Sequence, residues 1–468
     1  MTDVHPLATR GETMTAPAIA GIPRSAIRTM IKREHARFSA ANPRSRDLAA
    51  RAARHWLHGV PMHWMLDWGT PFPLFVAGAQ GATVTDADGH GHTDFCLGDT
   101  GAMFGHAPPP VVEAVRRQGE RGFTAMLPSE DTAIVGELLA QRFGLRYWQT
   151  AVTATDANRF VLRLARWLTG RPKILVFNGC YHGTVDETFV RLRNGRPIHR
   201  PGLVGQAVDL TANSKVVEFN DVAALDAALV PGDVACVITE PALTNIGMVL
   251  PQPGFHDALR AATRRTGTLL VIDETHSIST GPGGYTRAFD LAPDFFVLGK
   301  PVAGGIPCAV FGFTAEVAER LTELWAAKEP GHSGLGTTLS GSPLAMTAMR
   351  ANLEQVMTAA AYEHMLGLSA RLAQSVAALI AERSLPWHVS NLGARAEFVC
   401  APQPPRNGTE AAAAMHGDLE HAIHIYLLNR GVLIAPFHNM TLVCPATTAA
   451  DVDRLLEALR ACLGELLS

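Results

Sequence analysis

Residues 269–300 read LLVIDETHSISTGPGGYTRAFDLAPDFFVLGK, and this stretch decides the fold. It holds two short apolar runs, Leu269–Ile272 and Phe295–Leu298, bounded by glycine, proline and polar residues. Runs of this kind are typical of buried β-strands. Asp273 follows the first run and Gly299-Lys300 follows the second, so each predicted strand ends at an ionisable side chain.

The same pattern extends on both sides, from about residue 150 to residue 315. Further apolar strands are expected at Ile174–Phe177, Ala235–Thr239 and Cys308–Phe313. Helices are expected at Asp156–Leu168, Val222–Leu229 and Gly254–Thr266. Nearly continuous apolar strands that alternate with helices predict an α/β fold with a mostly parallel sheet covered on both faces.

The chain divides into four predicted parts. Residues 1–24 are rich in Thr, Ala, Pro and Gly and are expected to form a mobile tail. Residues 86–345 are expected to form the large domain, while 25–85 and 346–468 form a smaller α+β domain. Within the first of these two segments, Met62–Phe75 has aromatic side chains among prolines without periodicity. That pattern predicts a packed loop or a wall of the active-site pocket rather than a helix.

Composition excludes several classes of protein. The net charge is −3 and no basic stripe occurs, so no nucleic-acid partner is expected. We find no signal-peptide pattern and no apolar stretch approaching the length of a membrane span, which predicts a cytoplasmic protein without a membrane partner. The seven cysteines have neither CxxC nor zinc-type spacing, which predicts buried free thiols and no metal site.

Lysine is scarce, and one lysine stands where a reactive amine would be placed. Lys300 ends an apolar strand, whereas the other four lysines lie in polar or arginine-rich surroundings: Lys32, Lys173, Lys215 and Lys328. A lysine with little water around it is an amine nucleophile able to form a Schiff base. The alternative, a lysine that extends from the strand end into water, is equally weighted on this local pattern.

Three ionisable residues, Glu240, Asp273 and Lys300, follow successive predicted strands. In a parallel sheet their strand ends converge on one rim, where ligands bind. Burying each ion costs several kcal/mol unless it has a partner, and a cofactor of complementary charge would provide one. A single carboxylate of this kind is usually an ordinary loop residue, but the three together favour a site.

Two loops add weaker signals. Thr153-Ala154-Thr155-Asp156 precedes a helix, and free backbone N–H groups at a helix start favour a phosphate. The simpler interpretation of this turn is a threonine N-cap without a ligand. Tyr181 lies between Gly179 and Gly183 and offers a ring face for stacking. The loop Gly336–Pro343 is rich in hydroxyls and is either another phosphate contact or a plain connection.

In order and spacing, these segments resemble the class III aminotransferases, enzymes of fold type I that use pyridoxal phosphate (PLP). The resemblance is greatest to the glutamate-1-semialdehyde aminomutases and the β-amino-acid aminotransferases, and it extends from about residue 35 to the carboxyl terminus. The matching stretches are Asp86–Gly89, Gly105–Ala107, Gly170–Ile174, Cys180–Gly183, Glu240-Pro241, Pro251–Phe255, Asp273-Glu274, Leu298–Lys300 and Thr338–Ala345.

The resemblance implies two catalytic residues. Lys300 would hold PLP as a Schiff base, the internal aldimine, and its freed amine would carry a proton during the reaction. Asp273 would pair with the pyridine nitrogen and keep it protonated.

The resemblance also implies seven further cofactor-binding residues: Tyr181 and Thr275 on the two ring faces, Asn245 at the ring hydroxyl, Thr153, Ala154 and Thr155 at the phosphate, and Thr338 at the phosphate of the neighbouring subunit. The last role follows because enzymes of this family are homodimers with active sites at the interface.

The chain departs from the family pattern at three places. Thr153-Ala154-Thr155-Asp156 replaces Ser-Gly-Thr-Glu, and an alanine there would be strained if the backbone needed a positive φ. Thr275 stands where valine is common, with His276 after it. The segment around Trp64 lacks the arginine that related β-amino-acid enzymes use for a substrate carboxylate.

The expected activity is transamination from an amino donor, an amino acid or amine, to a keto or aldehyde acceptor. The first alternative is an aminomutase of the glutamate-1-semialdehyde type, or a racemase, on the same scaffold. A non-catalytic protein that kept the PLP fold is the remaining alternative.

Overall fold

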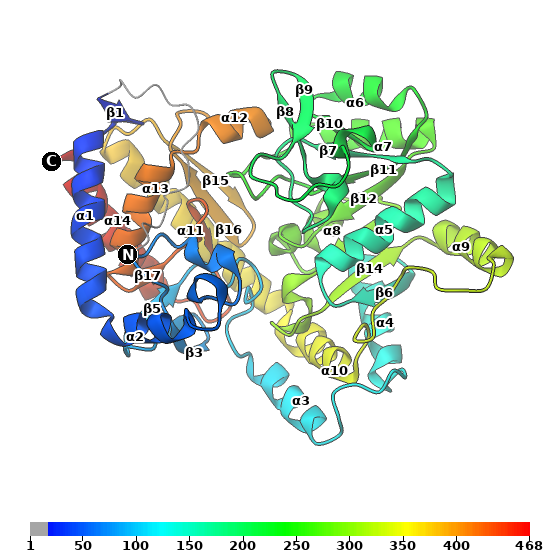
Figure 1. Cartoon of the computed structure of the whole chain (residues 1–468), viewed down its shortest axis with the longest axis horizontal. Coiled ribbons are helices and arrows are strands. Elements are labelled where there is room, and N and C mark those ends of the chain that lie inside the picture. Colours follow the sequence, from blue (N-terminus) through cyan, green and yellow to red (C-terminus); the bar gives the residue numbers. More distant parts are fainter. Residues whose placement is uncertain (1–16) are drawn as a thin grey trace.

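The computed structural model describes residues 17–468, and its largest sheet has seven strands (Figure 1). Their order is β10 (Ser214–Val217), β7 (Lys173–Phe177), β11 (Val234–Thr239), β12 (Leu269–Asp273), β13 (Phe295–Leu298), β14 (Ala309–Phe313) and β6 (Tyr147–Ala151). The strand β14 is antiparallel to both neighbours, and the other pairs are parallel. The predicted α/β fold with a mostly parallel sheet is confirmed.

One strand runs against expectation. The run Cys308–Phe313 was expected in the parallel set, but β14 is antiparallel. The reason is the short connection from Gly299 to Cys308, which holds only the 3₁₀ turn Lys300–Ala303. A parallel neighbour would need a crossover of a dozen or more residues.

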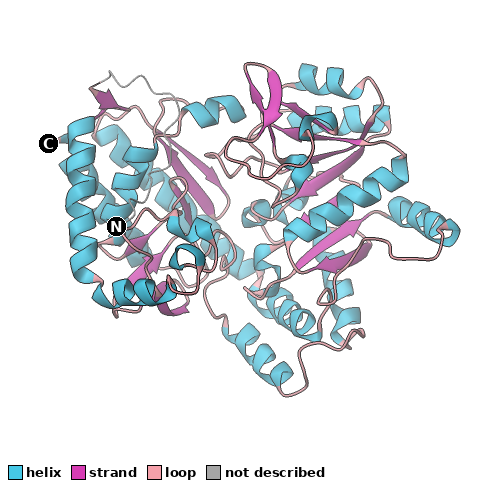
Figure 2. Ribbon diagram, viewed as in Figure 1, coloured by secondary structure: helices cyan, strands magenta, loops and turns pink. Residues whose placement is uncertain are grey.

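Helices pack on the sheet as the alternation predicted (Figure 2). The helix α5 (Ala154–Thr169) lies across β6, β11, β13 and β14, while α7 (Phe255–Thr266) packs on β12 and α6 (Val222–Leu229) on β10. The buried face of α5 repeats at helical spacing, with Ala157, Phe160, Val161, Leu164, Ala165 and Leu168. Because this face packs on the sheet, the first residues of α5 lie at the carboxyl ends of the parallel strands.

Beside this sheet, both ends of the chain build a second part of the molecule. It contains the sheets β17-β5-β4-β3 and β15-β16-β18. Its strands are β3 (Val76–Gln80), β4 (Thr83–Asp86), β5 (Gly91–Asp94), β15 (His388–Leu392), β16 (Arg395–Val399), β17 (Val432–Leu433) and β18 (Met440–Leu442). Its helices include α1 (Arg24–Ala41), α2 (Pro43–Ala52), α11 (Ala359–Glu382), α13 (Gly417–Leu428) and α14 (Ala449–Leu467).

The helices α3 (Pro109–Gly119), α4 (Asp131–Phe143) and α10 (Pro343–Ala351) pack together, and α9 (Ala315–Ala327) contacts α5. The helix α11 is long and apolar enough, by length and composition, to cross a membrane. Its buried side chains include Tyr362, Met365 and Leu372, and the helix packs on β15, β16 and α14. Helices inside a protein core pack in this way.

The predicted tail at residues 1–24 needs correction. Residues 1–16 lie outside the described residues, but β1 (Ala18–Ile19) pairs with β2 (Ile22–Pro23). Ile22 is fully buried because it joins the main apolar core. The part of the predicted tail that the structure describes is therefore a packed hairpin.

The aromatic segment Met62–Phe75 is a packed loop with one 3₁₀ turn, as expected. Trp68 and Phe72 pack against small apolar cores. No residue of the segment lines the main cavity of this chain, and its role as a wall of the active-site pocket stays a prediction. All seven cysteines are buried and free, which confirms the buried thiols.

Candidate active site

The ends of three neighbouring strands meet at one cavity. Glu240 follows β11, Asp273 ends β12, and Lys300 lies two residues after β13. These strands are adjacent and parallel, and all three side chains line a cavity of about 740 Å³. The predicted convergence of the three strand ends on one rim is confirmed.

Eight of the nine predicted site residues line this cavity: Thr153, Ala154, Thr155, Tyr181, Asn245, Asp273, Thr275 and Lys300. The ninth, Thr338, lies in the exposed loop before α10 and is not part of the lining. The roles of the nine residues stay predictions. Within residues 17–468, no group of three or more His, Cys, Asp or Glu side chains is arranged to hold a metal ion.

The start of α5 opens into the cavity. Thr153 is its N-cap, and the Oγ1 atom accepts a hydrogen bond from the backbone N–H of Asp156 at 3.2 Å. Ala154 begins the helix without a positive φ, so the alanine causes no strain. Gly183 has a φ of +78°, and a Cβ there would overlap Thr155 Oγ1. The glycine therefore lets the loop that carries Tyr181 lie directly against the turn.

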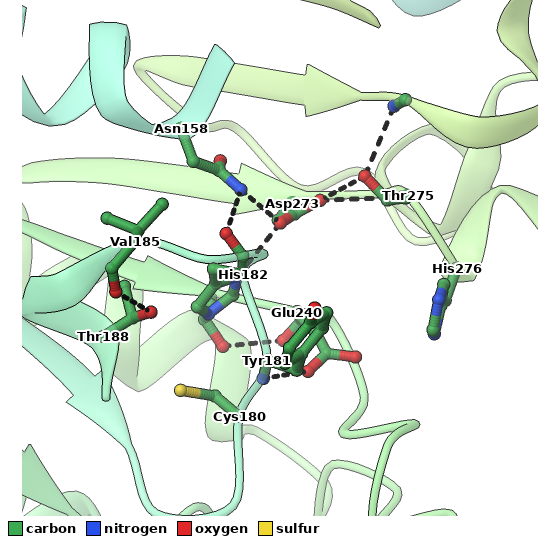
Figure 3. Close-up of polar contacts among 12 residues, drawn as sticks. Asn158, Cys180, Tyr181, His182, Val185, Thr188, Glu240, Asp273, Thr275 and His276 are labelled. Atoms are coloured by element: carbon green, nitrogen blue, oxygen red, sulfur yellow. Dashed lines mark hydrogen bonds and ion pairs between the residues drawn. The ribbon is translucent and has the colours of Figure 1, made fainter. Parts of the chain in front are cut away.

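Asp273 is held at the cavity wall by four hydrogen bonds, most of them visible in Figure 3. Its Oδ2 atom accepts from Asn158 Nδ2 at 2.9 Å and contacts His182 Nδ1 at 3.0 Å. Burial raises the pKa of the carboxyl, but the hydrogen bonds of His182, Thr275 and Asn158 and the charge of His182 together bring the net pKa below the usual value. An ionised carboxylate suits a protonated ring nitrogen.

His182 takes the positive charge of this buried pair. Burial lowers its pKa, while Cys180 and the carboxylate of Asp273 raise it, with a net pKa of about 10. His182 was not predicted as a site residue, although it stands in the quoted Cys180–Gly183 motif. Its position one residue after Tyr181 was the available signal.

The other oxygen of Asp273 faces Thr275. Asp273 Oδ1 accepts from the Thr275 backbone N–H at 3.1 Å and from its hydroxyl at 2.6 Å. A carboxylate has about four acceptor positions, so these four bonds occupy the whole group. The Thr275 hydroxyl can turn its hydrogen away for a ring nitrogen by rotation of the O–H group alone, while its oxygen accepts from the Gly299 backbone N–H at 3.3 Å.

Lys300 has two close partners, and no role was predicted for either of them from the sequence. Its Nζ atom donates to Asp99 Oδ2 at 2.6 Å and lies 2.5 Å from His276 Nε2. Asp99 sits in the turn Leu97–Thr100, where every φ is positive, between +47° and +82°. A carboxylate between glycines, Gly98-Asp99-Thr100-Gly101, was the signal that could have indicated it.

Arg395, on β16, donates a hydrogen bond to that turn. It is fully buried, and its Nη2 atom donates to Thr100 Oγ1 at 2.5 Å. Burial raises the pKa of Asp99, but Lys300, His276 and Arg395 hold it well below the usual range. Arg395 does not line the cavity, nor does any other arginine among residues 17–468.

The cavity fits a phosphorylated pyridine aldehyde. The free N–H groups at the start of α5 suit the phosphate, the ionised Asp273 suits the ring nitrogen, and the Lys300 amine suits the aldehyde. Tyr181 and Thr275 line the space between these groups. Each polar part of such a cofactor therefore has a matching group in this chain.

Comparisons with known proteins agree with this geometry. The family model for class III aminotransferases matches residues 65–463. A glutamate-1-semialdehyde 2,1-aminomutase from Desulfitobacterium hafniense is 32% identical over 402 residues, covering 84% of this chain and 91% of that protein.

Solved structures give the same likeness. A glutamate-1-semialdehyde-aminomutase from Pseudomonas aeruginosa superimposes with a TM-score of 0.94 and 53% identity, over 96% of this chain and 100% of that one. A lysine-to-alanine variant of that protein was solved in complex with PMP. A β-phenylalanine aminotransferase from Variovorax paradoxus has a TM-score of 0.82 and 26% identity, over 94% and 97% of the two chains.

Proposed function

Because this chain belongs to the class III aminotransferase family and uses PLP, we propose that it moves an amino group within one substrate molecule. The reaction is that of an aminomutase of the glutamate-1-semialdehyde type. The relatives named for this activity support the choice, at 32% and 53% identity. The earlier expectation of transamination becomes the second candidate.

The shared cavity of Lys300, Asp273 and the turn Thr153–Thr155 supports the PLP chemistry, and the likeness to the aminomutases carries the choice of reaction. PLP supplies, when bound, an aldehyde for an amine and a ring that withdraws electrons. Lys300 is the amine that holds the cofactor and then carries a proton to and from the substrate carbon. Asp273 stays ionised and orients the ring, while the start of α5 binds the phosphate.

Transamination between a separate donor and acceptor is favoured by a different observation, the likeness to the β-phenylalanine aminotransferase. The same residues serve both reactions, so the discriminating experiment identifies the product. Holoenzyme is incubated with glutamate-1-semialdehyde alone, without a keto acid. An aminomutase returns an isomer of the substrate that carries the amino group on the former aldehyde carbon, whereas a transaminase leaves a product that has lost its amino group, because the aldehyde of a second molecule can act as the acceptor. Deaminated product without the isomer would replace the first candidate by the second.

We also propose that the protein acts as a homodimer. Large apolar side chains are exposed near the N-terminal aromatic segment, along and after α3, and in the loop before α10: Trp56, Leu57, Met62, Trp64, Val112, Phe123, Met126, Leu127 and Leu339. Exposed apolar side chains in such numbers are typical of protein interfaces. Thr338 belongs to the last of these segments, which supports its predicted contact with a neighbouring cofactor phosphate.

A further inference from the structure

A chain of short hydrogen bonds leads from the Lys300 amine into the protein. Lys300 Nζ lies 2.5 Å from His276 Nε2, and His276 Nδ1 lies 2.8 Å from Thr244 Oγ1. Thr244 Oγ1 in turn lies 2.6 Å from Glu240 Oε2. His276, Thr244 and Glu240 are each at most 5% exposed, and His276 and Glu240 line the same cavity as Lys300.

The donors and acceptors along this chain can be assigned from its two ends. A charged Lys300 only donates, so His276 Nε2 must accept and its proton lies on Nδ1. That N–H donates to Thr244 Oγ1, and the Thr244 hydroxyl donates to the Glu240 carboxylate. Every hydrogen bond in the row then points from the amine toward the carboxylate.

We propose that His276 and Thr244 form a proton relay that moves the Lys300 proton to Glu240 and back. The relay rests on the proposed role of Lys300 as the amine that binds PLP. It gives His276, which follows the departure at Thr275, a direct part in preparing that amine.

The transfer balances along the row. One proton leaves the Lys300 ammonium for His276 Nε2, one leaves His276 Nδ1 for Thr244 Oγ1, and one leaves the Thr244 hydroxyl for Glu240. The result is a neutral amine and a neutral carboxylic acid, with His276 in its other tautomer and Thr244 again a hydroxyl. No proton is exchanged with bulk water, and no co-reactant is required.

Burial of the far end of the chain favours this neutral end state, while the Asp99 carboxylate beside Lys300 favours the return of the proton to the amine. Burial raises the pKa of Glu240, which helps its carboxylate accept a proton. Burial and Lys300 hold the pKa of His276 well below its usual value, so the imidazole passes protons without keeping a charge. The other charged groups that act on His276 are Asp99, Arg395 and Asp273. Asn245 Nδ2 lies 3.4 Å from His276 Nδ1, a longer contact than that of the Thr244 hydroxyl.

The test uses the first step that needs a neutral amine, the covalent capture of PLP. Full-length protein is stripped of cofactor and mixed with PLP, and the Schiff-base band is followed in time at several pH values. Wild type and Thr244→Ser keep the relay hydroxyl. Thr244→Val keeps the shape of the side chain but removes the hydroxyl that links His276 to Glu240. His276→Gln removes the imidazole that links Lys300 to Thr244. Thermal melting confirms that each variant is folded.

With the relay intact, the rate of PLP capture changes by less than about twofold for each pH unit below the usual range of a lysine amine. Without it, the proton must go to bulk water, and the rate falls about tenfold per pH unit below the usual range of a lysine amine. We expect wild type and Thr244→Ser to share the flat profile, and Thr244→Val and His276→Gln to share the steep one.

Equal profiles in all four proteins would overturn the relay while leaving the Schiff base at Lys300 intact. A steep profile for Thr244→Ser would also overturn it, because the hydroxyl is retained there. If Thr244→Val does not fold, His276→Gln decides the question. Absence of covalent capture by wild type would overturn the proposed role of Lys300, and the relay with it.

Discussion

Asp99 Oδ2 lies 2.6 Å from Lys300 Nζ, although 201 positions separate the two residues in the sequence. The carboxylate reaches the amine because the turn from Leu97 to Thr100 follows left-handed backbone throughout. This conformation is costly for Thr100, which is β-branched, and the hydrogen bond from Arg395 offsets that cost. A strained turn therefore positions the carboxylate that contacts the reactive amine.

Replacing Asp99 should make stability depend less on pH. Asp99→Asn removes the counter-charge of Lys300, and we expect cofactor-free protein to lose about 1–2 kcal/mol at neutral pH. The pKa of Asp99 is lowered, so its contribution is present above the ordinary value of 3.8 and is lost as the pH falls below it. Urea unfolding at a series of pH values should show that the difference in the free energy of unfolding between wild type and Asp99→Asn becomes smaller as the pH falls. A constant difference at every pH would contradict the charge effect.

Removing the Lys300 amine should abolish covalent attachment of PLP. In Lys300→Ala, borohydride treatment followed by intact mass measurement should show no added cofactor, and turnover should fall by at least about 10²–10⁴-fold. Lys328→Ala is the matched control, because Lys328 is half-buried away from the cavity and donates to the nearby backbone carbonyls of Glu329 and Gly331. Retention of the added mass in Lys300→Ala would place the Schiff base elsewhere.

Gly299 should tolerate no side chain while Ala154 faces it. A Cβ at Gly299 would lie 2.8 Å from Ala154 Cβ, so Gly299→Ala should cost about 1–3 kcal/mol and weaken PLP binding. Ala154→Gly removes the clashing methyl group. The double variant should therefore recover most of the loss, measured by urea unfolding and cofactor titration. If it is no better than Gly299→Ala alone, contact between the two residues is not the cause.

The Thr275 hydroxyl should compete with the cofactor for Asp273. Thr275→Val frees one acceptor position on the carboxylate, and we expect PLP to bind several-fold more tightly, by about 1 kcal/mol. Thr275→Ser keeps the hydroxyl and should bind like wild type. Cofactor titration of the stripped protein measures both. Weaker binding in Thr275→Val would mean that the hydroxyl supports the site instead.

Thr338 should act on the cofactor only across a dimer. We expect Thr338→Ala to weaken PLP binding about tenfold, through loss of a hydrogen bond to a charged phosphate. Thr337→Ala is the control, since the Thr337 hydroxyl bonds Ser340 within its own loop. Light scattering should give a dimer for both variants. A monomeric wild type with full PLP affinity would exclude this role.

The central strands could be predicted from sequence because burial on both faces makes them continuously apolar. The structure adds β6 and β10, which were not predicted. Both lie at the edges of the seven-stranded sheet, and β6 has exposed positions that break its apolar run. Edge strands need fewer apolar side chains, so periodicity alone does not reveal them.

Site residues that stand next to predicted strand or helix ends could be predicted for the same reason. Asp273 and Lys300 mark strand ends, and Thr153 marks a helix start. Asp99 and Arg395 could not, because one belongs to an irregular turn and the other to a distant strand, β16. Only tertiary packing brings them to the reactive amine.

The pairing of the two chain ends has a consequence for synthesis. The helix α1 is made before α13 and α14 and packs against both, as the blue, orange and red helices of Figure 1 show. At about 5–20 residues per second, the ribosome needs on the order of tens of seconds to produce those partners. During that time the apolar face of α1, with Ile27, Met30 and Phe38, lacks the contacts that α13 and α14 supply. The seven-stranded sheet can assemble meanwhile, so α1 is made before the sheet but completes its packing after it.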